Sequence, residues 1–475
     1  MNRPLRVAAI LALILAPTAL AAQPKNDPKD PVGIWEGPVR AGALELRLAF
    51  KIERDKNGNL TGTMDSVDQG VKGIPCSKVA FVDGKLSLEV GKGNIKVVGT
   101  MADDGGSFKC EFEQSKVKID LLLKRVAKAS TVNRPQLPKK PYPYLEETVE
   151  FENAAAAGIK LAGTLTMPKG DGPFPAVVLV SGSGPQDRDE TLLRHKPFLV
   201  IADHLTRKGI AVLRYDDRGV GKSGGKHLGA TSADFATDAH AAVTWLRGRK
   251  GIDPKRVGIM GHSEGGLIAP IVAADHPNDI AFLVLLAGPG VPGDELLLLQ
   301  QKVIQKAMGA TPEAMKLSDR LMAAILPIAK ESGTAEERTK KIETAANDFI
   351  AKLPKEEQKN MSAASGKAAA TMLGDTWMQY FLTYDPRPTL RKVKCPVLVV
   401  NGDLDLQVVP DQNVPAIEKA LRAGGNDRVA TKVFPKLNHL FQPATTGAPN
   451  EYGQIEETFS VEALGYVTEW LLKLK

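Results

Sequence analysis

The chain has 475 residues, of which 43% are hydrophobic and 25% charged, a balance typical of a soluble globular protein with ample length for a buried core. The formal net charge of +7 is spread thinly, because acidic residues are interleaved with basic ones almost everywhere. Nucleic-acid binders usually gather their Lys and Arg on one face or stripe. We therefore expect no nucleic-acid partner.

The first 21 residues have the layout of a secretory signal peptide. Arg3 and Arg6 precede an apolar run over residues 7–16, and Ala19-Leu20-Ala21 offers a small-x-small cleavage site. The apolar run is too short for a permanent bilayer anchor, and no cysteine stands beside the cleavage site to carry a lipid. We expect an exported protein, periplasmic or secreted, without a stable membrane anchor.

Residues 32–128 have the pattern of an antiparallel β module. Short runs such as LELRLAFKI and SFKCEFEQ alternate apolar and polar residues, and turn signals such as KNGN and DDGG separate them. This pattern predicts a barrel or a sandwich. A Pro-rich segment follows over residues 129–146, and we interpret it as a linker.

The chain contains three cysteines, and export would permit disulfides. Cys76 and Cys110 lie in the β module and could pair across its sheet, or all three thiols could be free. Cys395 is left over in either case and, just before an apolar strand, is expected in the core. No Cys or His cluster has zinc-ligand spacing, so we expect no metal and no organic cofactor.

From residue 147 onward, continuously apolar runs alternate with helix-length amphipathic segments. Such runs are typical of parallel strands buried on both faces of a sheet, so we predict a doubly wound, mostly parallel α/β domain over residues 147–475. The predicted strands are residues 176–182, 210–216, 256–262, 281–288 and 396–402. Residues 291–394 are rich in Ala, Leu, Lys, Glu and Met and lack strand patterns, which predicts an inserted helical cap.

Two serines stand in Gly-x-Ser-x-Gly patterns, Ser263 in GHSEG and Ser223 in GKSGG. Ser263 directly follows a predicted strand and opens an apolar helix, which is the context of a nucleophile elbow. The helix N-terminus there favours developing negative charge. Ser223 lies beyond the end of its strand and is followed by a loop. Ser263 is therefore the predicted nucleophile.

A serine nucleophile needs a base, and the base needs an orienting acid. His276 ends the helix that Ser263 begins and is too far along it to reach the hydroxyl, so His439, in the loop FPKLNHLFQ, is the predicted base. The acid should follow the strand PVLVVNG, at the carboxyl edge of the sheet. Asp405 is preferred there, and Asp403 is the alternative or else a turn-former.

The oxyanion of an acyl-transfer intermediate needs two N–H donors. One is the backbone N–H of Glu264, which follows the predicted nucleophile. The second is the N–H of Ser183, in the loop SGSGPQDRDE, whose glycines let the backbone approach a substrate. The alternative is that this loop is a plain flexible turn.

The segments SGSGPQDRDE, YDDRGVGKSGG, GHSEGG and LNHLF occur in this order. Together they resemble the α/β-hydrolase superfamily, in particular bacterial esterases and serine aminopeptidase-like hydrolases with an extra N-terminal β module. The resemblance covers the chain from about residue 147 to its end and implies a triad of Ser263, Asp405 and His439. The oxyanion loop begins Ser-Gly where many relatives have His-Gly.

The expected function is a serine hydrolase that cleaves small-molecule carboxylic esters through an acyl-enzyme. A peptidase of the same fold, perhaps an aminopeptidase, is the alternative, and it would need a carboxylate such as Glu264 to hold a substrate amino group. A third hypothesis is a binding protein whose hydrolase domain is vestigial. The oligomeric state does not follow from the sequence.

Overall fold

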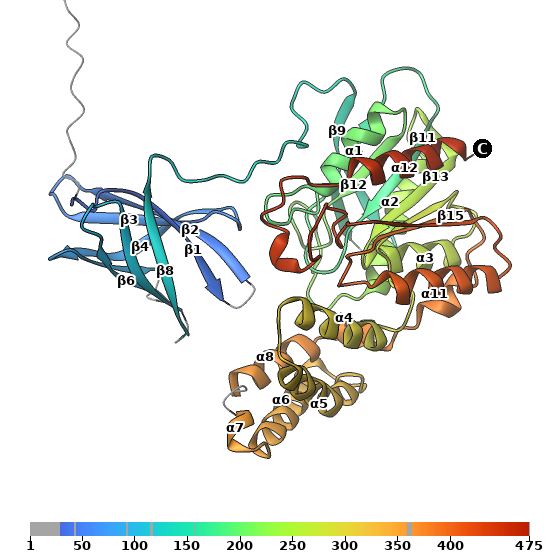
Figure 1. The fold of residues 1–475 in the computed structure, drawn as a ribbon. Coiled ribbons are helices and arrows are strands. Elements are labelled where there is room, and N and C mark those ends of the chain that lie inside the picture. The colour runs from blue at the N-terminus through green and yellow to red at the C-terminus, as the bar shows by residue number, and fades with distance from the viewer. Residues whose placement is uncertain are drawn as a thin grey trace, which may run out of the picture. The chain divides into compact units, whose positions relative to one another are not determined.

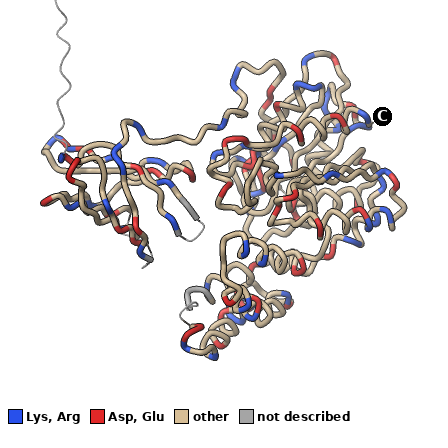
Figure 2. The backbone as a smooth tube through the Cα atoms, viewed as in Figure 1, with Lys and Arg blue, Asp and Glu red and all other residues tan. Residues whose placement is uncertain are grey.

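A computed structural model of the chain describes residues 29–41, 44–91, 94–114, 117–156, 158–358 and 363–474. The predicted signal peptide lies outside these ranges. Figure 1 shows a β unit and a larger α/β unit, and the latter includes the chain from Ala129 onward. Figure 2 shows basic and acidic residues interspersed in both units. Among the described helices, none combines the length and hydropathy needed to span a membrane.

The β unit is a closed barrel of eight strands in chain order. The sequence predicts either a barrel or a sandwich here, and the barrel is correct. The barrel closes where its first and last strands pair antiparallel, with Ile34 opposite Val126. Large side chains fill its interior, among them Trp35, Phe50 and Phe108, each fully buried. The strands are β1 Gly33–Ala41, β2 Leu44–Arg54, β3 Leu60–Ser66, β4 Val71–Val82, β5 Lys85–Val90, β6 Ile95–Met101, β7 Ser107–Gln114 and β8 Val117–Val126.

All three cysteines are free thiols, which decides between the two alternatives left by the sequence. Cys76 lies on β4 and Cys110 on β7, and strands β5 and β6 stand between them in the barrel wall. Neighbouring strands are about 4.8 Å apart, so the two sulfur atoms are far beyond bonding distance. Cys395 is half-buried and packs against the main core of the α/β unit.

The α/β unit is built on an eight-stranded sheet with the order β16-β15-β14-β13-β11-β12-β10-β9. Strands β11 to β16 are parallel, and β9 and β10 add an antiparallel pair at one edge. The predicted mostly parallel sheet is therefore confirmed, with two edge strands that were not predicted. The strands are β9 Leu145–Asn153, β10 Ile159–Met167, β11 Phe174–Val180, β12 Ala211–Tyr215, β13 Ile252–His262, β14 Leu283–Leu286, β15 Val397–Gly402 and β16 Val429–Phe434.

Helices cover both faces of this sheet (Figure 1), which explains its continuously apolar strands. On one face, α2, α3 and α11 pack on one set of strand residues, with Val243, Val272 and Ile417 in that core. On the other face, α1 and α12 pack on the alternate set, with Phe198 and Val467 in that core. The helices are α1 Pro197–Arg207, α2 Ser232–Arg247, α3 Gly265–Asp275, α11 Pro410–Ala423 and α12 Val461–Lys473, with a 3-10 turn at Pro449–Glu451.

A helical insertion separates β14 from β15, as the composition of residues 291–394 predicts. It has a small core of its own that includes Ile325, Ile342 and Leu382. Its helices are α4 Gly293–Ala307, α5 Pro312–Ala329, α6 Ala335–Ala351, α7 Lys355–Gln358, α8 Ala363–Leu373, α9 Thr376–Thr383 and α10 Pro386–Leu390.

The Pro-rich segment before β9 lies against the α/β unit. The guanidinium of Arg134 is largely buried and donates hydrogen bonds to the backbone carbonyls of Leu193, Gly453 and Ile455, at 2.8 to 2.9 Å. The amide of Gln136 donates to the carbonyl of Phe459 at 2.7 Å. These bonds fix part of the segment in place, although its composition alone indicates only a spacer.

Candidate active site

Ser263 occupies the sharp turn between strand β13 and helix α3. Its φ is +52°, a left-handed conformation that is costly for a residue with a side chain and is concentrated at functional sites. Its N–H donates to the carbonyl of Leu286 on β14 at 2.9 Å, and its carbonyl accepts from Gly266 at 2.8 Å. The strand, turn and helix that the sequence predicts around Ser263 are therefore present.

The two glycines of the motif are required by close backbone approach. A Cβ on Gly261 would lie 2.0 Å from the carbonyl oxygen of Gly265. A Cβ on Gly265 would lie 2.1 Å from the carbonyl oxygen of Val180 on β11. Neither contact is possible, so only glycine allows the turn to hold the Ser263 side chain in this position.

His439 and Asp405 come together at the carboxyl edge of the sheet. His439 Nδ1 lies 2.8 Å from Asp405 Oδ2, and both side chains are buried. The other carboxylate oxygen, Oδ1, accepts from the N–H groups of Gln407 and Val408, at 2.8 Å each. A proton on Nδ1 that is held by the carboxylate leaves Nε2 as the atom that can accept a proton.

Asp403, the alternative acid, has a different role. It is exposed, and its Oδ1 accepts a hydrogen bond from the N–H of Lys436 at 2.6 Å. It therefore stabilises the turn after β15, which is the role that the sequence left open for it.

Ser263, His439 and Ser183 line one cavity of about 110 Å³. Among the described residues, the backbone N–H of Ser183 and that of Glu264 have no hydrogen-bond acceptor. The preceding N–H, of Gly182, is occupied by Glu190 Oε1 at 2.7 Å. Two unoccupied N–H donors, one on each of the predicted segments, are what an oxyanion would need.

The oxyanion loop is anchored at its first position. The hydroxyl of Ser181 donates to Asp217 Oδ1, and the N–H of Gln186 donates to Asp217 Oδ2, both at 2.9 Å. Burial raises the pKa of Asp217 to about 8. Ser181, the first residue of SGSGPQDRDE, thus ties this loop to the YDDRGVGKS segment.

Ser223 is a structural residue. Its hydroxyl donates to the carbonyl of Asp216 at 2.6 Å and accepts from the N–H of Ala162 at 2.9 Å. The loop that carries it is thereby joined to strand β10, the second strand from the edge of the sheet. Among the described residues, both partners of the Ser223 hydroxyl are backbone groups, and neither is a histidine side chain.

One oxygen of the Glu264 carboxylate is engaged by two hydrogen bonds. Glu264 Oε1 accepts from the hydroxyl of Ser232 at 2.6 Å and from Trp377 Nε1 at 2.7 Å. Burial raises its pKa above the ordinary range, and these two hydrogen bonds oppose the shift. Because Trp377 belongs to helix α9, this contact joins the residue after Ser263 to the helical insertion.

The sequence analysis missed Glu190 and His262. His262 directly precedes Ser263, and its buried ring lies between Glu190 Oε1, at 2.8 Å, and the carbonyl oxygen of His439, at 3.0 Å. The position of His262 within the motif was a usable signal. Nothing in the sequence pairs it with a glutamate 72 residues earlier.

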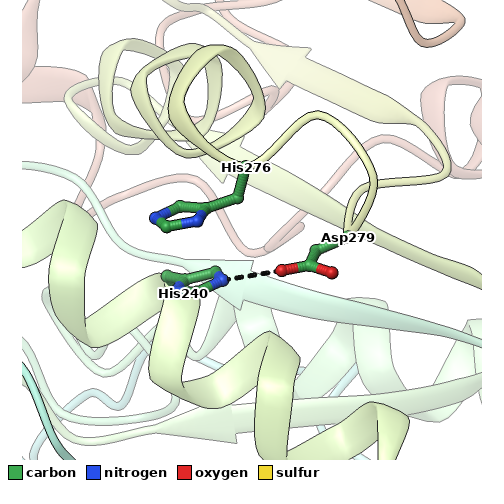
Figure 3. A group of neighbouring side chains, drawn as sticks. All are labelled: His240, His276 and Asp279. Carbon is green, nitrogen blue, oxygen red and sulfur yellow. Dashed lines mark hydrogen bonds and ion pairs between the residues drawn. The ribbon is translucent and has the colours of Figure 1, made fainter.

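His276 lies at the other end of α3 from Ser263, as expected. Figure 3 shows its ring stacked on that of His240, with centroids 3.5 Å apart, and His240 Nε2 bonded to Asp279 at 2.9 Å. In the described part of the chain, this is the one group of side chains whose donor atoms could surround a metal ion. Asp279 is already paired with the cation of Arg247, and the stacked rings would have to separate to share an ion.

Comparison with known proteins agrees with this architecture. The sequence profile of the family described as "Serine aminopeptidase, S33" matches residues 196–442, which is more than half of the chain. Esterase EstD of Thermotoga maritima is 28% identical over 377 residues, which cover 77% of this chain and 79% of that protein. The thiohydrolase apmlB of Arthrinium phaeospermum is 30% identical over 149 residues, which cover 31% of this chain and 45% of that protein.

Solved structures of two hydrolases are also similar to this chain. The Pyrococcus furiosus esterase Pf2001 is 18% identical with a TM-score of 0.41, and the match covers 73% of this chain and 99% of that one. A proline iminopeptidase of Mycobacterium smegmatis is 17% identical with a TM-score of 0.41, and the match covers 69% of this chain and 98% of that one. On the extent of the profile match, the chain belongs to the S33 serine aminopeptidase-like family of α/β-hydrolases.

Proposed function

We propose that this protein is an exported serine hydrolase that cleaves small-molecule carboxylic esters, with Ser263 as nucleophile, His439 as base and Asp405 as the orienting acid. The observation that carries the proposal is the buried His439–Asp405 pair, at 2.8 Å, beside the cavity that the strained Ser263 also lines. The 28% identity to a Thermotoga maritima esterase over most of both chains supports an ester substrate.

The proposed reaction follows from these positions. His439 Nε2 takes the proton from Ser263 as its Oγ attacks the ester carbonyl carbon, and the carbonyl oxygen becomes an oxyanion that accepts from the N–H groups of Ser183 and Glu264. When the intermediate collapses, the C–O bond breaks and His439 returns the proton to the leaving alkoxide. A water molecule, activated in the same way, then attacks the acyl-enzyme and releases the acid.

The choice between ester and peptide substrates rests on the carboxylates beside the cavity. Among its described lining residues, Glu190 is the one carboxylate, and it is occupied by Gly182 and His262. Glu264, the carboxylate considered for holding a substrate amino group, is buried among Ser232 and Trp377. A substrate ammonium group would have to compete with these hydrogen bonds on Oε1 of both carboxylates, which favours esters over aminopeptidase substrates.

The test compares p-nitrophenyl acyl esters with aminoacyl p-nitroanilides and adds labelling by a fluorophosphonate probe. We expect ester turnover, labelling of the wild type and of Ser223→Ala, and no labelling of Ser263→Ala. Anilide turnover without ester turnover would favour the peptidase. A folded wild type that the probe does not label would favour the binding protein.

Export is part of the proposal and has its own test. Expression in a Gram-negative host should give a processed protein in the periplasm or medium, with its N-terminus at Ala22 by mass spectrometry. Full-length protein that stays in the cytoplasm would contradict export and leave the catalytic proposal intact.

A further inference from the structure

His262 lies at the end of β13 with its ring between two hydrogen-bond acceptors. Nδ1 is 2.8 Å from Glu190 Oε1, and Nε2 is 3.0 Å from the backbone carbonyl oxygen of His439. The side chains of His262 and Glu190 are each 7% exposed. The ring of His262 also contacts that of His439, with centroids 4.9 Å apart.

The nature of these neighbours defines the charge of His262. A carbonyl oxygen can only accept, and Glu190 Oε1, which also receives the N–H of Gly182, can only accept when Glu190 is a carboxylate. A neutral imidazole has one N–H and one lone pair, so either tautomer would direct its lone pair at an acceptor. Beside the carboxylate of Glu190, only the imidazolium, with a proton on each nitrogen, satisfies both contacts.

Three segments of the catalytic site meet at this ring. Glu190 holds Gly182, the residue before the oxyanion donor Ser183. His262 is adjacent to the nucleophile in the chain, and its Nε2 holds the backbone of the base, His439. We propose that Glu190 and His262 are positioning residues, a buried carboxylate–imidazolium pair that sets the oxyanion loop and the catalytic histidine in register with Ser263. This inference rests on the proposed function.

The direction in which the pKa of His262 is shifted agrees with this geometry. Burial alone would lower its pKa, but the charge and hydrogen bond of Glu190, the carbonyl of His439 and the charge of Asp405 outweigh burial and raise the pKa. Glu190 faces the ring of His262 from the oxyanion loop, His439 from the loop after β16, and Asp405 from the loop after β15. Because the folded-state pKa lies above the unfolded value, the stabilisation is complete at pH below the unfolded value and is lost as pH rises through the folded one.

The proposed pair predicts that kcat falls at alkaline pH as His262 loses its proton. We call this fall the alkaline limb of the kcat profile. In Glu190→Gln, the amide oxygen can still accept from Gly182 and His262, but the counter-charge is gone. We expect the alkaline limb of its kcat profile to move to lower pH than that of the wild type. His262→Ala should lower kcat on the order of 10²-fold with little change in KM, because the donors and the base lose their alignment.

A matched control is a further carboxylate–imidazole pair of the α/β unit, His240 with Asp279, which is half-buried, away from the proposed catalytic residues, with His240 Nε2 2.9 Å from Asp279 Oδ2. Asp279→Asn should leave the kcat profile unchanged. An alkaline limb of Glu190→Gln that coincides with that of the wild type would overturn the proposal.

A second measurement does not depend on activity. With ¹³C-labelled histidine, the Cε1–H resonance of His262 is identified by its loss in His262→Gln and is followed against pH by NMR. We expect it to titrate above the free-histidine range, and at lower pH in Glu190→Gln; a ring that is neutral at pH 6 would overturn the proposal. If Ser263→Ala kept probe labelling, the nucleophile assignment would fail, whereas this titration would still decide whether the pair is charged.

Discussion

His439 Nδ1 lies 2.8 Å from Asp405 Oδ2, while two backbone N–H groups hold the opposite oxygen of the same carboxylate. This carboxylate is fixed from both sides and can orient only one imidazole. Asp405 differs in this from its neighbour Asp403, whose carboxylate accepts a hydrogen bond from the backbone N–H of Lys436 and contacts no histidine in the described hydrogen bonds.

Asp405→Asn should therefore lower kcat for p-nitrophenyl esters on the order of 10⁴-fold, because an amide N–H facing Nδ1 favours the wrong tautomer of His439. Asp403→Asn should leave kcat within about two-fold, since the amide oxygen can still accept from Lys436. Circular dichroism would verify that both variants are folded. An inactive Asp403→Asn beside an active Asp405→Asn would exchange the two assignments.

Gly261→Ala should prevent folding or lower the unfolding free energy severely, because the new Cβ would lie 2.0 Å from the backbone oxygen of Gly265. Gly465→Ala is the matched control. Gly465 lies inside α12, and its Cβ would meet nothing within 4 Å. Since alanine is the better helix former, we expect a gain of about 1 kcal/mol in urea unfolding with activity unchanged. Equal effects of the two substitutions would contradict the account of the elbow.

Local chemistry explains how much of this site the sequence predicts. Ser263 is recognisable because strand, glycine-flanked turn and helix are consecutive, and Asp405 because it lies three residues after the end of an apolar strand, where the resemblance to α/β-hydrolases implies the acid. The Glu190–His262 pair depends on the path of a loop in which Glu190 itself has φ +51°, and it joins residues 72 positions apart. Contacts of this kind leave no periodic signal in the sequence.

The fold likewise has elements that the sequence predicts and elements that it does not. Continuously apolar runs predicted the parallel strands, whereas the antiparallel pair β9 and β10 was missed. Strand β9, LEETVEFEN, is mostly polar because it lies at the edge of the sheet, so it lacks the pattern of a strand buried on both faces. The bond between Glu264 and Trp377 spans 113 residues and likewise depends on how the helical insertion folds back.

Glu264→Gln should change how stability depends on pH. The amide oxygen can still accept from Ser232 and Trp377, but the group no longer ionises. Burial raises the pKa of Glu264 above its unfolded value, so the native wild type holds its proton longer and loses stability as pH rises between the two values. We expect the unfolding free energy of Glu264→Gln, relative to wild type, to increase with pH across that window. A difference that stays constant from acid to neutral pH would show that Glu264 is ionised without penalty.

The cysteines provide a prediction about the reactivity of the folded chain. Burial raises the pKa of Cys76 to about 11 and the pKa of Cys110 and of Cys395 to about 12. Thiolate is the reactive form, so at pH 8 a disulfide reagent such as DTNB should modify the native protein slowly, and the rate should increase as pH approaches 11. In guanidinium chloride all three thiols should react at once, without prior reduction. A stoichiometry near one, restored to three by a reductant, would mean that two of the cysteines pair during export and would contradict the separation of Cys76 and Cys110 on strands β4 and β7.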